Sequence, residues 1–326
     1  MGATVVVVGS FNVDHVWTLD ALPAPGETRS GAYASGPGGK GFNQAVASAR
    51  SGVATRFACA LGDDAGGQYA RALAVADGID LRDAAADAPT GSAGIFVDAG
   101  GRNSIVVAPG ANDALDAAHV QAAFDGEPPR VVLSQLETPA AGAQAAFAVA
   151  RAAGALAILN PAPANAAVPA SLLDQVDLLT PNETEFAALA RTHLGVALDP
   201  NTLAASTDTD LHAHCRRLLP RGSVVVTLGA AGVFVSHAAD ALRGDGEACY
   251  RVPACKVVAV DTTGAGDAFN GALAASLAAA PERPFARHAA YAVAYAGLST
   301  ERPGAALSMP SRDDVLARFP DAAGPA

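Results

Sequence analysis

Short runs of apolar residues recur along the chain, and alanine-rich stretches lie between several of them. The first run, Thr4–Val8, is stopped by Gly9. A short, continuous apolar run of this kind is typical of a strand buried on both faces of a parallel sheet. Similar runs are Val131–Leu133, Leu156–Leu159, Val176–Leu179 and Val224–Leu228, and stretches long enough for helices are Pro139–Ala153 and Glu183–Leu194. The alternation predicts an α/β protein with a doubly wound, mostly parallel sheet flanked by helices.

Two segments break this alternation. His15–Ser35 carries strand-type residues interrupted by Gly26 and Gly31, and Gly91–Ala108 has two strand-type runs joined by a Gly-Gly turn, which is typical of a hairpin. Neither segment has a helical partner. We expect about residues 15–35 and 91–108 to form a small β-sheet lid on a single domain that spans residues 1–326. The polar, turn-rich segment Asp199–Asp210 is interpreted as a surface insertion.

The composition narrows the classes of partner. The 326 residues include 21 lysines and arginines and 32 aspartates and glutamates, which gives a formal net charge of −11. This balance argues against a nucleic-acid binder or a protein held on an anionic membrane. No apolar run approaches 18 residues, so no membrane span is expected. The four cysteines include no CxxC pair, which is typical of reduced thiols, and we expect a cytoplasmic protein.

Asp261–Asp267, with the sequence DTTGAGD, is the strongest candidate for a chemical site. A helical pattern follows it, so Gly264, Ala265 and Gly266 should lie at or within the first helical turn. Free N–H groups and the positive end of the helix favour an anion there, especially one that gains charge during a reaction. Asp267 beside that anion would accept a proton from an attacking hydroxyl. The structural alternative is an ordinary N-terminal helix residue behind a glycine turn.

A second glycine-rich segment is Gly36–Gln44, with the sequence GPGGKGFNQ. Gly39 precedes Lys40, and Asn43 follows within one turn, so the two side chains could form a pocket wall that donates hydrogen bonds to hydroxyl oxygens. The alternative is a flexible hinge with a solvated lysine. The spacing is not that of a Walker A loop, and residues 9–14 lack the GxGxxG pattern, which disfavours a dinucleotide-binding dehydrogenase.

Polar residues also follow the first predicted strand and the strand at Val131–Leu133. Asn12 and Asp14 come just after the first strand, at the edge where α/β sheets bind ligands. The carboxylate of Asp14 can hold two neighbouring sugar hydroxyls. An Asx turn would explain both residues equally well. Glu137 is either a further polar sugar contact or a solvated residue at the start of a helix.

Two later segments follow strands in the same way. In Pro181–Glu185, Asn182 could cap a helix with Glu185 completing a capping box. The functional alternative is that both residues lie near phosphates and water-coordinated Mg²⁺. Thr227–Gly232 ends a strand with two glycines, Gly229 and Gly232, which suits a nucleotide lying against the backbone. An ordinary turn would have a similar sequence.

Together these segments resemble the PfkB family of carbohydrate kinases, and within it the ribokinase branch. The match runs in order along nearly the whole chain, and it comprises Gly9–Asp14, Gly38–Asn43, Leu136–Glu137, Asn160–Ala164, Pro181–Glu185, Thr227–Gly232 and Asp261–Asp267. The resemblance implies an α/β domain with a β-sheet lid that uses ATP and Mg²⁺ to transfer the γ-phosphoryl group to a sugar hydroxymethyl.

The resemblance also implies roles for individual residues. By its position in the motif, Asp267 resembles the catalytic base of the family, and the anion hole would be formed by Gly264, Ala265 and Gly266. The implied sugar contacts are Asn12, Asp14, Gly39, Lys40, Asn43, Glu137 and Asp267. The implied nucleotide contacts are Asn182, Thr227, Gly229, Gly232 and Gly266. Glu185 would hold Mg²⁺ through water, and a monovalent cation such as K⁺ would lie near Asp261, Thr263, Ser299, Arg302, Gly304 and Ser308. A homodimer through the lid is a further expectation.

Within the family, the Asn160–Ala164 and Gly38–Asn43 segments favour D-ribose, with ribose 5-phosphate as product. The alternatives are a kinase of the fructokinase or adenosine kinase type, and a non-catalytic sugar-binding regulator on the same fold. No side chain is assigned to the adenine. His212–Cys215, with the sequence HAHC, suggests either a metal cluster or a solvated helix face.

Overall fold

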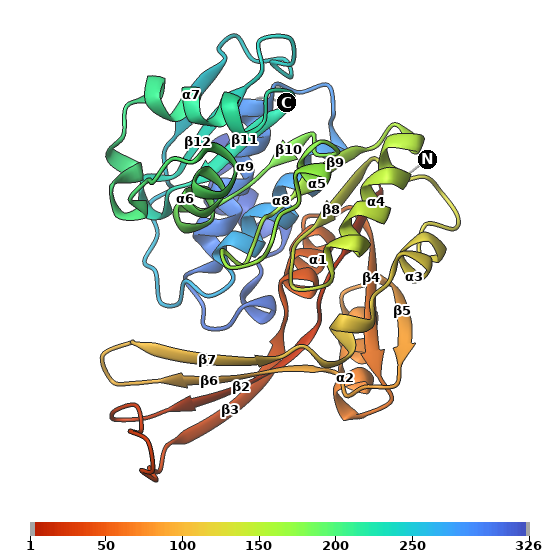
Figure 1. Ribbon diagram of the computed structural model, residues 1–326, viewed down its shortest axis with the longest axis vertical. Helices are drawn as coiled ribbons and strands as arrows, with labels where there is room; N and C mark the ends of the chain where they lie inside the picture. The colour runs from red at the N-terminus through yellow and green to blue at the C-terminus, as the bar shows by residue number, and fades with distance from the viewer. Residues whose placement is uncertain (1–3, 324–326) are drawn as a thin grey trace.

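Nine strands form the main sheet of the computed structural model, which describes residues 4–323 (Figure 1). Their order is β13-β12-β11-β10-β9-β8-β1-β4-β5. The bounds are β1 Thr4–Val8, β4 Ala54–Gly62, β5 Asp80–Ala86, β8 Val131–Ser134, β9 Leu156–Leu159, β10 Leu178–Leu179, β11 Ser223–Thr227, β12 Val233–His237 and β13 Cys249–Val252. Neighbouring strands are parallel except β11–β12 and β12–β13, which are antiparallel. The predicted doubly wound, mostly parallel sheet is confirmed.

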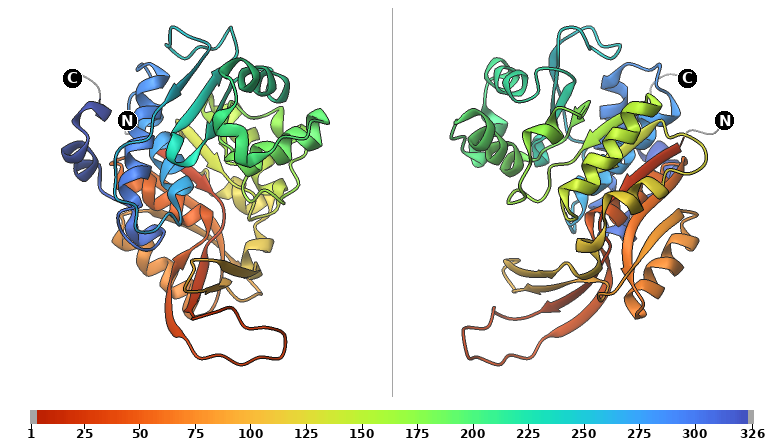
Figure 2. Two further views of the ribbon diagram at one scale, coloured as in Figure 1. Left: turned by 90° about the vertical axis from the view of Figure 1, so that its left-hand side faces the viewer. Right: turned by 45° about the vertical axis from the view of Figure 1, so that its right-hand side comes forward.

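Helices cover both faces of this sheet (Figure 2). Along β1 the side chains of Val5 and Val7 join the core beneath α1, α8 and α9, while Val6 and Val8 join the core beneath α4, α6 and α7. The helices are α1 Lys40–Arg50, α2 Ala65–Ala76, α3 Ala117–Ala122, α4 Ala140–Ala153, α5 Ala170–Leu173, α6 Glu183–Leu189, α7 Asp208–Leu218, α8 Ala265–Ala279, α9 Phe285–Ser299 and α10 Arg312–Arg318. Within residues 4–323, no helix is both long and apolar enough to cross a membrane.

Three predicted segments differ from the structure in detail. The strand predicted at Val176–Leu179 is only Leu178–Leu179, because Val176 still closes the turn that follows α5. The helix predicted at Glu183–Leu194 ends as an α-helix at Leu189 and continues as one wide turn. The predicted surface insertion, Asp199–Asp210, contains a 3₁₀ turn and the start of α7, and it is anchored to the core by Leu203, which is 2% exposed.

The two segments that break the alternation form a separate small sheet. Its strands are β2 Asn12–Thr18, β3 Ala32–Gly38, β6 Gly91–Val97 and β7 Asn103–Ala108, in the order β3-β2-β6-β7. The predicted hairpin is the antiparallel pair β6–β7. The sheet projects from the end of the main body at which β1 finishes, as the lower part of Figure 1 and both views of Figure 2 show. It therefore stands beside the carboxyl edge of the main sheet.

The close packing of α1 against α8 depends on Gly271. A Cβ atom at this position would lie 2.3 Å from the carbonyl oxygen of Gln44 and 2.6 Å from Cβ of Ala47. We expect Gly271→Ala to lower the free energy of unfolding by about 1–3 kcal/mol, because the two helices must move apart. Urea unfolding measures this. Gly246→Ala is the matched control, since its Cβ would meet nothing within 4 Å; an equal loss in both variants would contradict the packing argument.

Candidate active site

A cavity of about 150 Å³ opens at the carboxyl edge of the main sheet. It brings together predicted residues from distant parts of the chain, namely Lys40, Asn182, Glu185, Thr227, Gly264, Ala265, Gly266 and Asp267. A larger cavity, of about 930 Å³, lies at the opposite edge beside Arg130 and Leu156 and includes none of the predicted residues. The smaller cavity is the candidate site, because it combines helix-end amides with a buried carboxylate.

The first turn of α8 forms one wall of this cavity. Gly264 precedes the helix with φ 75°, and a Cβ there would lie 2.9 Å from Cβ of Ala305, so a glycine is required. The N–H of Ala265 donates to the carbonyl of Thr262 at 3.2 Å. The N–H groups of Gly266 and Asp267 have no acceptor among residues 4–323. Two free amides at the positive end of a 15-residue helix make this wall suited to an anion.

Asp267 lies beside these amides and is 6% exposed. Its Oδ2 accepts a hydrogen bond from Nδ2 of Asn43 at 2.9 Å, and its Oδ1 accepts one from Nε2 of Gln44 at 2.9 Å. Burial raises the pKa of Asp267, although the charge of Lys40 and the two amide donors act in the opposite direction. The carboxylate is therefore held in one orientation at the wall of the cavity, as the sequence predicts.

Lys40 is the first residue of α1, and Gly39 is its N-cap. The side chain is half-buried, so the alternative of a solvated lysine on a hinge is wrong. Burial opposes its charge, but the carboxylates of Asp267, Glu137, Glu185 and Asp14 outweigh it and raise the pKa of Lys40. Within the described residues its ammonium group makes no ion pair closer than 4 Å. The site thus holds a permanent cation that is available to a ligand.

The predicted sugar contacts lie where the small sheet joins the main body. Asn12 and Asp14 are residues of β2, so the alternative of an Asx turn is wrong. The Oδ1 of Asn12 accepts a hydrogen bond from Nδ2 of Asn112 at 2.9 Å. Burial, then the charges of Glu137 and Asp267, raise the pKa of Asp14 to about 6. Among residues 4–323, no group donates a hydrogen bond to the carboxylate of Asp14.

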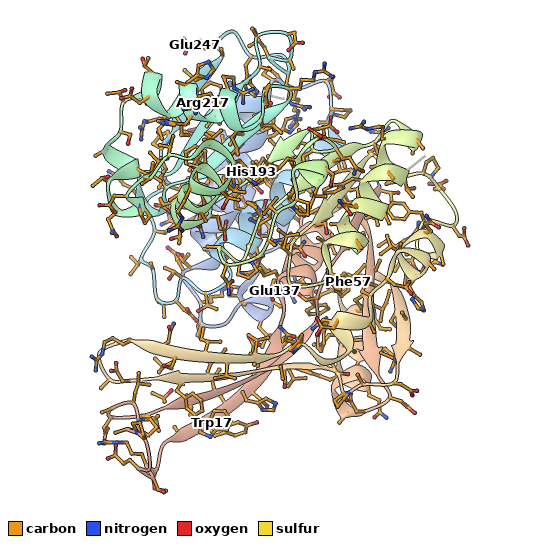
Figure 3. The ribbon with its side chains drawn as sticks, viewed as in Figure 1. Trp17, Phe57, Glu137, His193, Arg217 and Glu247 are labelled. Carbon is orange, nitrogen blue, oxygen red and sulfur yellow. The ribbon has the colours of Figure 1, made fainter. Side chains whose placement is uncertain are left out.

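Glu137 lies at the junction of the two sheets, which Figure 3 labels between the main body and the small sheet. Its Oε2 accepts hydrogen bonds from the hydroxyl of Ser10 at 2.7 Å and from the backbone N–H of Lys40 at 2.9 Å. The alternative of a solvated helix-start residue is therefore wrong. Glu137 ties the ends of β1 and β8 to the first turn of α1.

On the opposite side of the cavity, Asn182 and Glu185 form the capping box that the sequence suggests. Oδ1 of Asn182 accepts from the N–H of Glu185 at 2.8 Å, and Oε2 of Glu185 accepts from the N–H of Asn182 at 2.9 Å. Glu185 is 5% exposed, and burial raises its pKa. Asn182 forms a parallel β-bridge with Thr227 of the neighbouring strand, β11. Gly229 and Gly232 lie in the turn that follows β11. The predicted capping box is thus confirmed, and Asn182 and Glu185 also line the cavity.

The residues predicted to hold a monovalent cation are only partly brought together. Asp261 accepts hydrogen bonds from the N–H groups of Thr263 and Gly304, each at 2.9 Å, so the two segments meet. The hydroxyls of Ser299 and Ser308 donate to the carbonyls of Ala296 and Ala305 in their own segments. The side chain of Arg302 is exposed.

The HAHC segment lies on α7, away from the cavity. Nδ1 of His212 is 2.8 Å from the hydroxyl of Ser236, and Cys215 is fully buried in the core. Within residues 4–323, no group of three or more histidine, cysteine or acidic side chains has a geometry able to hold a metal ion.

Sequence reasoning assigned no role in the site to a set of buried polar residues around Asp267, of which Asn160, Thr180 and Asn270 line the cavity while Gln44 and Gln135 lie behind it. Each follows a strand or lies on a helix that faces the site, and they are Gln44, Gln135, Asn160, Thr180 and Asn270. The side chains form a continuous chain of hydrogen bonds around Asp267. The available signals were the place of Gln44 beside Asn43 in the glycine-rich segment and the place of Asn160 at the start of the Asn160–Ala164 segment.

A cation, a buried carboxylate and free helix-end amides in one cavity define the site of a group-transfer enzyme that handles a phosphate. Comparison with known proteins identifies the family. Residues 3–312 match the family described as pfkB family carbohydrate kinase. A ribokinase from Haemophilus influenzae is 37% identical over 322 residues, which cover 97% of this chain and 98% of that protein.

Solved structures agree with this result. A ribokinase from Thermotoga maritima has a TM-score of 0.82 at 31% identity and covers 97% of this chain and 99% of that one. The structure of Arabidopsis thaliana ribokinase complexed with ribose and ATP has a TM-score of 0.80 at 30% identity and covers 97% of this chain and 98% of that one. The chain belongs to the pfkB family of carbohydrate kinases. It is a phosphotransferase that acts on a sugar, and the alternative of a non-catalytic regulator is set aside.

Proposed function

We propose that this protein is an ATP-dependent ribokinase, which converts D-ribose and ATP to ribose 5-phosphate and ADP. The observation that carries the proposal is the position of Asp267, which lies in one cavity with Lys40 and beside the free amides of α8. The ribokinases from Haemophilus influenzae and Arabidopsis thaliana, to which the chain is similar over nearly its whole length, support ribose and ATP as the substrates.

In the proposed reaction, Asp267 accepts the proton of the sugar hydroxymethyl group. The oxygen forms a bond to the γ-phosphorus while the bond from that phosphorus to the β,γ-bridging oxygen breaks, and ADP leaves. Negative charge develops on the transferred group, and the free N–H groups of Gly266 and Asp267, which follow Gly264 and Ala265, stabilise it. Lys40 adds a positive charge to the same cavity.

The sugar is proposed to contact Asn12, Asp14, Gly39, Lys40, Asn43 and Glu137. Asn43 supports this assignment, because its Nδ2 donates to Asp267 while its Oδ1 is buried and has no hydrogen-bonding partner among residues 4–323. An unpaired buried acceptor costs free energy, and a sugar hydroxyl would satisfy it. Asn43 would then bind the substrate and the base at the same time.

The nucleotide is proposed to lie against Asn182, Thr227, Gly229, Gly232 and Gly266. Mg²⁺, held through water by the buried carboxylate of Glu185, would offset phosphate charge; the carboxylate oxygens of Glu185 suit this hard cation. For K⁺ the proposed ligands are oxygens of Asp261, Thr263, Ser299, Arg302, Gly304 and Ser308, several of them backbone carbonyls. The contact between Asp261 and Gly304 supports this set, since it joins the two segments that contribute the oxygens.

The small sheet is proposed to act as a lid and to pair with the lid of a second copy of this chain. Trp17, labelled in Figure 3, stacks on Phe96 with ring centroids 5.2 Å apart and also contacts Tyr33, which is 55% exposed. The cross-strand register puts these rings on one face, together with Val106, which is 67% exposed. An apolar face of this kind is typical of a protein interface.

A panel of sugars and nucleosides tests the function. ADP release is measured with D-ribose, 2-deoxy-D-ribose, D-fructose and adenosine, each with ATP and Mg²⁺, with and without K⁺. We expect the highest kcat/KM with D-ribose. A clear preference for D-fructose or adenosine would replace ribokinase by one of the related activities, and sugar binding without any ADP release would contradict the proposal.

A further inference from the structure

Gln44 is the residue behind Asp267 that has no assigned role. It is fully buried, and its side-chain amide has three hydrogen-bonding partners. Nε2 donates to Oδ1 of Asp267 at 2.9 Å and to Oδ1 of Asn160 at 3.1 Å, while Oε1 accepts from Nε2 of Gln135. Neither Gln44 nor Gln135 lines the cavity. Gln44 therefore acts on the cavity only through the two side chains that it holds there, Asp267 and Asn160.

The orientations of the Asn160 and Gln44 amides follow from one backbone carbonyl. The carbonyl oxygen of Thr180 can only accept, so the amide of Asn160 must turn Nδ2 toward it, at 2.9 Å. Oδ1 of Asn160 then faces Gln44. Because this oxygen can only accept, Gln44 must turn its donor, Nε2, toward it. The same orientation presents the second hydrogen of Nε2 to Asp267, and it leaves Oε1 for Gln135. A flipped Gln44 would bring oxygen against the oxygens of both Asp267 and Asn160.

The other end of the chain reaches the amides of α8. The hydroxyl of Thr180 donates to Oδ1 of Asn270, and Nδ2 of Asn270 donates to the carbonyl of Gly266 at 2.8 Å. One buried network therefore holds both the carboxylate of Asp267 and the first turn of the helix that carries it. Fixed relative positions of this kind are what a transfer between two bound substrates requires.

We propose that Gln44 is a positioning residue for Asp267, and that Gln135 and Asn160 determine the orientation of its amide. The inference rests on the proposed function, in which Asp267 is the base. Gln44 keeps one carboxylate oxygen bound, so that the proton of the sugar hydroxyl is received in a single geometry. Its N–H also favours the charged form of Asp267, which burial disfavours.

The test compares Gln44→Met with Gln144→Met, a matched control on α4 that lies outside the cavity and is only half-buried. With D-ribose and ATP, we expect Gln44→Met to lower kcat by roughly 10²-fold, the scale of a misplaced reacting group, with little change in the KM for D-ribose. The acidic limb of the pH profile of kcat should move to higher pH, because Asp267 loses a donor to its charged form. The control should match the unmodified protein.

A second variant keeps the test decisive if Gln44→Met does not fold, as judged by thermal unfolding. Gln135→Met leaves the bond from Gln44 to Asp267 intact but releases the amide from one partner, and we expect a smaller loss of kcat with a shift of the acidic limb in the same direction. A folded variant at either position with an unmoved acidic limb overturns the inference. Unchanged turnover in Asp267→Asn would instead overturn the proposed function, so the two failures are distinguishable.

Discussion

Replacing Asp267 by asparagine is expected to lower kcat for sugar phosphorylation by roughly 10²–10⁴-fold, the usual contribution of a positioned base. The amide cannot accept the proton of the hydroxymethyl group. It also presents an N–H group to one of the two donors, Asn43 or Gln44, that the carboxylate accepts from. Steady-state kinetics with D-ribose and ATP measure the effect, and the KM for the sugar should change much less than kcat.

Asp313→Asn is the matched control, because Asp313 is also an acidic residue in the first turn of a helix, α10, but lies outside the cavity. We expect it to retain the activity of the unmodified protein. Thermal unfolding of both variants separates a chemical loss from a loss of structure. If Asp267→Asn retained near-normal turnover, the assignment of Asp267 as the base would be wrong.

Asp14→Ala is expected to raise the KM for the sugar by roughly 10²–10³-fold while kcat falls less, because two hydrogen bonds to a charged carboxylate are lost. Asp14 is in β2, and a Cβ atom at Gly38 of the neighbouring strand would lie 2.2 Å from the Asp14 carboxylate. The Asp14 carboxylate thus occupies the space that a side chain at position 38 would fill. Asp20→Ala, at an exposed position just beyond β2, is the control. An unchanged KM for every accepted sugar would remove Asp14 from the sugar site.

The same carboxylate predicts a pH dependence of sugar affinity. Because the pKa of Asp14 is raised to about 6, the group is charged above this pH and becomes protonated as the pH falls through it. The protonated carboxyl is a weaker acceptor for sugar hydroxyls, so the KM for D-ribose should rise as the pH is lowered below about 6. Asp14→Ala should flatten this dependence. A KM profile that is identical in both proteins would contradict it.

The sequence predicted the parts of the fold that local pattern determines. The valine run of β1 and the alanine-rich α4 follow directly from composition and length. β4 was not predicted, because its sequence, ATRFACALG, has few β-branched residues. Its pairing with β1 and β5, which are its neighbours in space, makes it a strand. Long-range hydrogen bonding therefore outweighs weak local preference.

The residues of the candidate site also fall into those that a local pattern could predict and those that it could not. Asp267 and its glycines could be predicted, because a glycine bend before a helical pattern is a local signal. The environment of Asp14 could not be decided, since it depends on β3 and β6, strands that are distant in sequence. The other polar residues around Asp267 were given no role for a related reason. Gln135, Thr180 and Asn270 are isolated polar side chains, and only the folded chain brings them to one network with Gln44 and Asn160.

The junction between the small sheet and the main body has a consequence for how the sugar binds. Asn12 pairs in register with Gly38, and α1 begins two residues later at Lys40. Any tilt of this sheet must therefore carry Asn12 and Asp14 toward or away from Asp267. By thermodynamic linkage, a sugar that binds the tilted-in arrangement more tightly must also shift the sheet toward that arrangement.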